Sequence, residues 1–170
     1  TIDDALGEAF DKTAKLLGVA FPGGAQIEIL AKNGNPNRYN LPKPIFNKGG
    51  CNLSFAGLKT AILKIAKNIK TEKEKFDLAA SFQRTIEEIL HKKTKIAFKD
   101  FENRIKLKEK IFVVAGGVAA NKKIRSMLIN LCEEKNYRSI FPPIELCGDN
   151  AAMIAMAVSY THLTLPTINW

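Results

Sequence analysis

The sequence predicts an α/β protein with a helical elaboration at its amino end. Residues 111–115 (IFVVA) have the character of a buried strand that leads into a glycine loop and then a helix over residues 122–135. Residues 138–141 resemble a second strand, which is followed by a polar loop and an apolar helix over residues 150–157. Strands that alternate with helices form parallel sheets, and ligands bind where the carboxyl ends of such strands meet. The pattern therefore predicts a small-molecule crevice at this edge of the sheet.

Helical periodicity dominates the residues before the first strand. Residues 1–17 carry apolar side chains at helical spacing and are followed by Gly18 as a stop signal. Residues 25–32 are expected to form a shorter helix, and residues 54–69 a basic amphipathic one. The amino end is therefore expected to be a layer of helices.

A long helix and two irregular segments complete the expected order. The capping box Thr71-x-x-Glu74 opens this helix, whose apolar side chains fall along one side up to a charged connector at residues 104–110. Residues 34–52 hold three prolines and a paired glycine, which predict an extended loop. The expected divisions are a helical inter-lobe segment with a basic connector (1–110), a strand–loop–helix part (111–157) and a tail (158–170).

The glycine loop after the first strand is the richest local signal. Gly116 and Gly117 permit positive φ and let a ligand approach the main chain, although they could simply connect a strand to a helix. Asn121 can offer a donor and an acceptor to a ligand, or cap the helix that follows. A second loop, Cys147-Gly148-Asp149-Asn150, is expected at the same edge.

Composition and charge narrow the class of protein. The 170 residues are 46% hydrophobic and 25% charged, which is typical of a soluble globular protein. Lys and Arg outnumber Asp and Glu by 26 to 17, which suits a polyanionic partner or gives a solvated lysine-rich surface. Three widely separated cysteines indicate reduced thiols in the cytoplasm. The longest apolar run, residues 151–158, is too short to span a bilayer, so no membrane partner is expected.

Both ends of the chain look unlike those of a complete natural protein. The chain starts without Met inside a helix-like pattern, so we expect an amino-terminal portion to be missing. Residues 158–167 (VSYTHLTLPT) break the helical pattern, and their reverse translation resembles the transposase adapter used in sequencing libraries. We therefore expect residues 158–170 to be a non-native tail that does not pack, with Leu163 and Leu165 outside the core.

Six segments occur in an order and spacing that resemble a known family. They are TIDDALGEAFDK (1–12), FPGG (21–24), SFAGLKT (54–60), AASFQ (79–83), VVAGGVAAN (113–121) and ELCGDNAAMIA (145–155). Over residues 1–157 they resemble the TsaD family of tRNA threonylcarbamoyladenosine synthases. The resemblance implies that the chain corresponds to the carboxyl-terminal half of a family member.

The resemblance also implies a fold and a reaction. The fold would be an actin-like ATPase fold of RNase H-like lobes, with the second lobe and a helical insertion present here and the N-terminal lobe mostly missing. The reaction would transfer threonylcarbamoyl from threonylcarbamoyl-adenylate to N6 of the adenosine next to the anticodon, in tRNAs reading codons that start with A. The implied partners are tRNA, a TsaB-like paralogue and a TsaE-like ATPase, in the cytoplasm.

Three residues match the family's substrate-binding positions. They are Asp11, Gly24 and Asn121. A carboxylate at Asp11 can accept hydrogen bonds from ribose hydroxyls, and a side chain at Gly24 would block the ligand. From the residue types alone, Asp11 would be a surface aspartate beside Lys12 or Lys15, and Gly24 a turn glycine.

Asp149 matches the family's catalytic, metal-binding aspartate. The resemblance places its two histidine co-ligands, spaced His-x-x-x-His, in the missing half. Such a ligand set suits one divalent metal ion, with iron favoured over zinc, which could polarise the carbonyl under attack. From the residue type alone, an N-cap is the favoured role for Asp149. Gly148 replaces the family's usual Thr, and without the histidine pair we expect the fragment itself to be inactive.

Basic clusters and two other functions remain open at this point. Candidate tRNA contacts, or solvated faces, are Lys59, Lys64 and Lys67, then Lys92, Lys93 and Lys95, then residues 104–110. The alternatives are an actin-like small-molecule kinase and a non-catalytic tRNA-binding or scaffold paralogue. The kinase would share a glycine-rich adenosine loop but not SFAGLKT or ELCGDNAAMIA.

Overall fold

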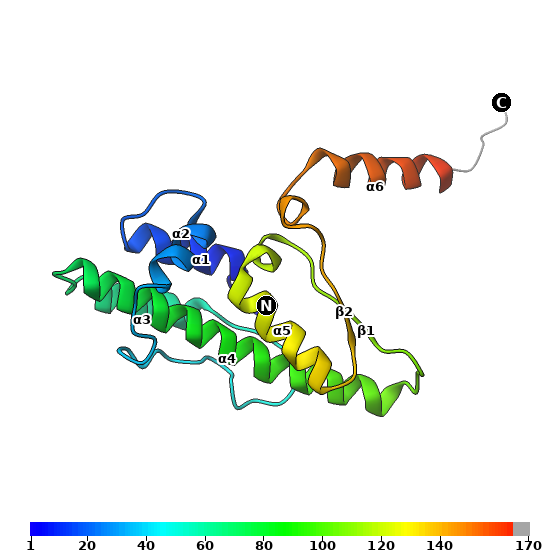
Figure 1. The fold of residues 1–170 in the computed structure, drawn as a ribbon, viewed down its shortest axis with the longest axis horizontal. Coiled ribbons are helices and arrows are strands. Elements are labelled where there is room, and N and C mark those ends of the chain that lie inside the picture. Colours follow the sequence, from blue (N-terminus) through cyan, green and yellow to red (C-terminus); the bar gives the residue numbers. More distant parts are fainter. Residues whose placement is uncertain (165–170) are drawn as a thin grey trace.

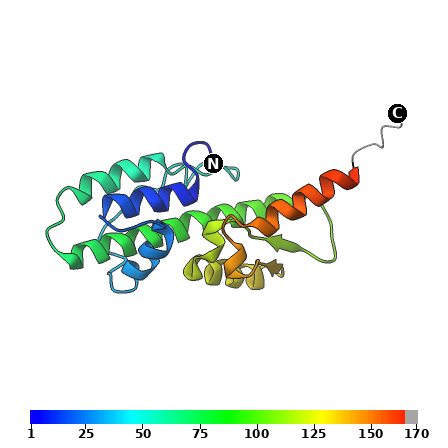
Figure 2. The same ribbon diagram turned by 90° about the horizontal axis from the view of Figure 1, so that it is seen from above.

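The computed structural model describes residues 1–164, with side chains described through Thr161. Helix α4 (Glu72–Arg104) is the longest helix and runs through the middle of the helical layer (Figure 1). Helices α1 (Leu6–Leu16), α2 (Gly23–Ala31) and α3 (Ala56–Ala66) gather at its amino-terminal end. Figure 2 shows the same helical layer from above. The predicted order of helices is confirmed.

Helix α4 begins where the sequence predicts. The Glu74 backbone N–H donates to Thr71 Oγ1 (3.2 Å), and the Thr71 N–H donates to Glu74 Oε2 (3.1 Å), so the capping box is complete. The main core lies along the apolar side of this helix. Its largest fully buried apolar side chains are Phe55, Phe82, Ile27, Leu58, Ile62, Leu78, Ile86, Ile89 and Ile124.

Helix α1 begins at Leu6, so the prediction of a helix from residue 1 is wrong. The Asp3 carboxylate accepts hydrogen bonds from the Ser54 hydroxyl and from the Phe55 backbone N–H (2.7 Å). These bonds, the Ser54 hydroxyl first, hold the pKa of Asp3 below its ordinary value. The contact draws the first residues away from a helical path and fixes the start of α3.

A parallel strand pair carries the predicted edge. Strand β1 (Ile111–Val113) pairs with β2 (Arg138–Ile140), with Phe112 opposite Ser139, and α5 (Lys122–Glu134) connects them. The α/β prediction is confirmed, but that of a buried first strand is wrong, because Val113 is 62% exposed. Within the described residues, Phe112, Val114 and Phe141 pack against the core, whereas Ile111, Val113 and Ile140 on the other face of the two-stranded sheet are exposed.

Helix α6 (Ala151–Thr164) continues past residue 157, where the sequence pattern predicts its end. Each added residue gains a hydrogen bond once a helix is nucleated, and the chain has no proline here before Pro166. Residues 151–161 are all exposed, and α6 lies apart from the helical layer (Figure 1). The expected positions of the Leu163 and Leu165 side chains lie outside the described part. No helix in the described residues is long and apolar enough to cross a membrane.

Candidate functional site

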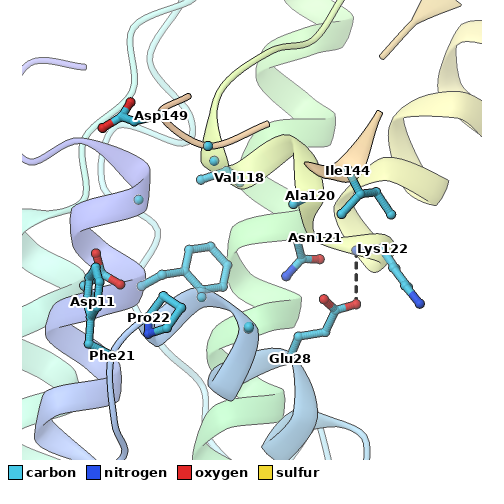
Figure 3. Close-up of a pocket in the computed structure, with 16 residues that line it drawn as sticks. Asp11, Phe21, Pro22, Glu28, Val118, Ala120, Asn121, Lys122, Ile144 and Asp149 are labelled. Carbon is cyan, nitrogen blue, oxygen red and sulfur yellow. Dashed lines mark hydrogen bonds between the residues drawn. The ribbon is translucent and has the colours of Figure 1, made fainter. Parts of the chain in front are cut away.

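One cavity of about 640 Å³ brings together residues from distant parts of the chain (Figure 3). Helices α1 and α2 form one wall, and the 3-10 helix η1 (Gly117–Ala120), the start of α5 and residues 144–149 form the other. Five of the six residues expected in the site line it: Asp11, Gly24, Gly117, Asn121 and Asp149. Gly116 lies beside it, in a neighbouring apolar pocket of about 440 Å³.

Asp11 fixes the geometry of the first wall. Its Oδ1 accepts a hydrogen bond from the Gly23 backbone N–H (2.9 Å), which anchors the first residue of α2 against α1. From the residue type alone Asp11 would be a surface aspartate beside Lys12 or Lys15, but it is half-buried and pairs with neither lysine. Lys12 pairs instead with Asp4 (2.8 Å) and Glu8 (2.7 Å).

The first two positions of α2 are occupied by glycine for different reasons. A Cβ on Gly23 would lie 2.7 Å from the Asp11 Cα, so the packing of α1 on α2 requires glycine there. A Cβ on Gly24 would meet nothing within 4 Å, and its backbone is helical, so the fold does not require glycine at this position. Gly24 lines the cavity, so its lack of a side chain would serve to leave space for a ligand.

Gly116 is required by the backbone conformation of the loop. Its φ of 89° with ψ of 170° lies in a region open essentially to glycine alone. This conformation turns the chain from β1 into η1 and brings Gly117 to the cavity. A Cβ added to Gly117 would have no neighbouring atom within 4 Å, so the cavity is open at that point.

Asn121 is buried and hydrogen-bonded through both of its polar atoms. Its Oδ1 accepts from the Ile124 backbone N–H (3.0 Å), which confirms its role as the N-cap of α5. The same oxygen accepts from Gln83 Nε2 (3.2 Å), and Asn121 Nδ2 donates to Gln83 Oε1 (3.0 Å). Any ligand contact of Asn121 therefore adds to an existing structural role.

Gln83 and Glu28 also belong to this region, and the sequence did not single out either of them as a site residue. Gln83 is 4% exposed on α4, and the signal that could have found it is an uncharged polar residue on the apolar side of that helix. Glu28 lines the cavity, and its Oε1 accepts from the Lys122 backbone N–H (3.0 Å), as the dashed line in Figure 3 shows. A glutamate within a short helix carries no sequence signal for such a contact.

Asp149 lies at the cavity without serving as a helix cap. The Met153 backbone N–H donates to Asn150 Oδ1 (3.0 Å), so Asn150 takes the capping position at α6. Asp149 is exposed and makes no hydrogen bond or ion pair within the described residues. Its carboxylate is consequently available to a ligand.

The described residues do not make a complete metal site. No group of three His, Cys, Asp or Glu side chains among them could hold an ion. Asp149 is the one member of the expected ligand set in this chain, and His91 sits on α4 without lining the cavity. The metal therefore remains a prediction that needs ligands from beyond these residues.

The chemistry of the lining favours a ligand with hydroxyl groups and a flat apolar part. Asp11, Glu28 and Asp149 contribute carboxylates, whereas Lys122 contributes one cation. Carboxylates accept hydrogen bonds from hydroxyls but repel a bare phosphate. Apolar contacts come from Phe10, Phe21, Val118 and Ile144. The lining can accept hydroxyl donors and contact an apolar group, whereas a phosphate bound here would need added positive charge.

The second basic cluster serves the fold. Lys93 is 3% exposed, and its Nζ donates to the carbonyl oxygens of Lys48 (2.9 Å) and Gly50 (3.2 Å). Lys92 Nζ donates to Asn47 Oδ1 (2.7 Å) and lies 4.0 Å from the centre of the Phe46 ring. These bonds fasten the proline-rich loop to α4, so a nucleic-acid contact by Lys93 does not fit the structure.

The other two basic clusters remain open to solvent. Lys59 and Lys64 on α3 and Lys67 at its C-cap are exposed and form no ion pair within the described residues. In the connector after α4, Lys106 and Lys108 are likewise exposed. Both clusters stay available to an anionic partner.

Comparisons with known proteins agree on one family. The model of TsaD, described as tRNA N6-adenosine threonylcarbamoyltransferase, matches residues 1–156. A protein of that name from Pelagibacter ubique is 73% identical over 156 residues, which cover 92% of this chain and 44% of the relative. One from Rickettsia rickettsii is 52% identical over 160 residues, covering 92% of this chain and 46% of the relative. The chain thus spans less than half the length of these curated relatives.

Proposed function

Because the chain belongs to the TsaD family, we propose that it forms part of the site that transfers threonylcarbamoyl from threonylcarbamoyl-adenylate to tRNA. The acceptor is N6 of the adenosine next to the anticodon in tRNAs reading codons that start with A. The observation that carries the proposal is the meeting of Asp11, Gly24, Gly117, Asn121 and Asp149 in one cavity, although they come from four separate segments.

The adenylate is proposed to lie between the two walls of this cavity. The Asp11 oxygen that does not hold Gly23 is free to accept a ribose hydroxyl, and the open space at Gly24 admits the sugar. Gly117 lets the main chain approach the ligand closely. Asn121, whose amide is held by Gln83 and by the start of α5, presents its remaining N–H in a fixed orientation.

A divalent metal at Asp149 is also proposed, with iron favoured over zinc and the remaining ligands supplied from outside this chain. Three carboxylates and one lysine line the cavity, so a cation would offset the repulsion of the adenylate phosphate. When bound, such an ion can polarise the carbonyl under attack. The chain's own contribution is to present the Asp149 carboxylate from a loop whose helix is capped by Asn150.

The wider setting is proposed on the same basis. The β1–α5–β2 unit would belong to an RNase H-like lobe of an actin-like fold, and a TsaB-like paralogue and a TsaE-like ATPase would act with the enzyme in the cytoplasm. The exposed lysines of α3 and of the connector after α4 are the candidate tRNA contacts. The family match does not favour a small-molecule kinase or a non-catalytic paralogue.

A chimeric enzyme tests the proposal. Residues 1–156 of this chain would replace the matching segment of the Pelagibacter ubique relative, with which they share 73% identity. The chimera should convert tRNA adenosine to the N6-threonylcarbamoyl form, measured by mass spectrometry of tRNA nucleosides, when supplied with the adenylate and the helper proteins. A chimera that folds but forms no modified nucleoside, while the unaltered relative does, would contradict the proposed function.

A further inference from the structure

The guanidinium of Arg125 contacts both loops that leave the parallel strands. Arg125 is the fourth residue of α5, and its Nε donates to the Ala119 carbonyl oxygen in η1 (3.0 Å). One Nη donates to the Pro142 carbonyl oxygen just after β2 (2.9 Å). The guanidinium carbon also lies 4.8 Å from the centre of the Phe141 ring. A single half-buried side chain therefore joins the two strand exits.

The second loop is tied further through a thiol. The same Nη lies 3.5 Å from Cys147 Sγ, and that sulfur is 3.5 Å from the Pro143 carbonyl oxygen. Cys147 is buried and directly precedes Gly148 and Asp149. Arg125 thus reaches the base of the segment that presents Asp149.

The two joined loops form one wall of the cavity. Gly117, Val118 and Asn121 belong to the first loop, and Ile144 and Asp149 belong to the second. The two strands themselves pair over only three residues each, so the sheet alone gives the loops little support. The relative position of the loops depends on contacts such as those of Arg125.

Arg125 directs its charge only at neutral acceptors. In the described part of the chain it forms no ion pair, and its partners are two carbonyl oxygens, a sulfur and an aromatic face. The planar guanidinium donates from separate nitrogen atoms in fixed directions, whereas the three donors of a lysine ammonium all radiate from one nitrogen. Hydrogen bonds from a charged donor are also stronger than those from a neutral one.

We propose that Arg125 is a positioning residue that sets the spacing between the Gly117 loop and the Asp149 loop and thereby the affinity for the adenylate. The proposal rests on the proposed function for its ligand. The mechanical coupling of the two loops is independent of that function, because it follows from the contacts of Arg125 alone.

The coupling is tested by amide hydrogen exchange in the chimeric enzyme. The backbone N–H groups of Asn121 and Cys147 are hydrogen-bonded to Val118 (3.0 Å) and Ile144 (3.2 Å), so they report on one loop each. Arg125→Met should accelerate exchange in both loops together. Arg138→Met is the matched control, since Arg138 is exposed and pairs with Glu109 (3.4 Å). Unchanged exchange in either loop of Arg125→Met would overturn the proposal.

Kinetics test the consequence for the ligand. Arg125→Met and Arg125→Lys should each raise KM for the adenylate by about ten- to a hundredfold, because a displaced wall misplaces the ligand. KM for tRNA should stay within about twofold, and only Arg125→Lys should keep the thermal midpoint near that of the parent. A purely structural role predicts lower kcat at unchanged KM for the adenylate, and restoration by lysine. That result would refute the proposal, whereas an inactive parent chimera would refute only the proposed function and leave the exchange test decisive.

Discussion

The side chains of Gln83 and Asn121 exchange two hydrogen bonds across the interface between α4 and α5, at 3.0 Å and 3.2 Å. Both residues are buried, and Asn121 also caps α5. The pair therefore connects the long helix of the core to the loop that lines the cavity. It gives the proposed substrate loop a fixed position without using any charge.

Replacing Gln83 should cost stability. Gln83→Leu leaves the Asn121 amide buried without its partner, which should lower the free energy of unfolding of the chimeric enzyme by about 1–3 kcal/mol. Urea unfolding measures the loss. Gln26→Leu on the half-buried surface of α2 is the control and should change it by less than about 0.5 kcal/mol. Equal effects of the two substitutions would show that the Gln83–Asn121 pair contributes nothing specific.

The glycine pair at α2 should separate folding from ligand binding. Gly24→Ala should keep or raise stability, by about 0.5 kcal/mol, because the backbone is helical and the space is open. It should nevertheless raise KM for the adenylate, since the new methyl group enters the cavity. Gly23→Ala, its matched control, should lower stability by about 1–3 kcal/mol because its Cβ would meet Asp11. A Gly24→Ala enzyme with parental KM would exclude a ligand at this point.

Asp149 and Asn150 should separate chemistry from capping. In the chimera, Asp149→Ala should abolish transfer and lower the bound metal measured by elemental analysis, with stability changed by less than about 0.5 kcal/mol. Asn150→Ala removes the bond to Met153 and should cost about 1 kcal/mol of stability while leaving bound metal near the parental amount. If Asp149→Ala retained its metal and modified tRNA at the parental rate, the metal assignment would be wrong.

Asp77 should make stability depend on pH. The Asn35 backbone N–H, which donates to Asp77 Oδ1 (2.7 Å), and then Lys73 hold the pKa of Asp77 below its ordinary value of 3.8. A lowered folded-state pKa gives stability that is complete above the ordinary value and is lost as pH falls through the folded value. The stability gap between parent and Asp77→Asn should therefore be smaller at about pH 3 than at about pH 7.

Urea unfolding at several pH values checks the Asp77 prediction. Asp100→Asn on the exposed end of α4, where Asp100 pairs only with Arg104 among the described residues, is the control. A gap between parent and Asp77→Asn that stayed constant with pH would show that the Asn35 contact does not stabilise the charged form.

Two groups of lysines should differ in tRNA binding. Replacing both Lys64 and Lys67 by Ala removes exposed charges at the carboxyl end of α3 and should weaken tRNA binding, with a salt dependence shallower by about one to two units of slope. Lys93→Ala should leave the salt dependence unchanged and lower stability, because the buried Lys93 side chain donates to the loop carbonyls of Lys48 and Gly50. Filter binding at several salt concentrations distinguishes the two, and a change in slope for Lys93→Ala would contradict its structural role.

Local patterns determined most of the elements. Residues three or four apart on a helix share a face, so periodicity predicted the helices, and the Thr71–Glu74 capping box predicted the start of α4. The alternation of strand and helix predicted the parallel pair of β1 and β2. The motifs also indicated the site candidates Asp11, Gly24, Gly117, Asn121 and Asp149. All of these signals lie within a few consecutive residues.

Tertiary packing decided what each of these residues contacts. Asp3 bonds to residues 51 and 52 positions away and so moves the start of α1, Lys93 is buried under a distant loop, and Gln83 meets Asn121 across 38 residues. At α6, Asn150 caps the helix, and its neighbour Asp149 does not. Contacts of this kind depend on how helices pack around a shared core. Local sequence patterns do not reveal these contacts, because the free energy of each contact depends on burial and on partners that only the folded arrangement supplies.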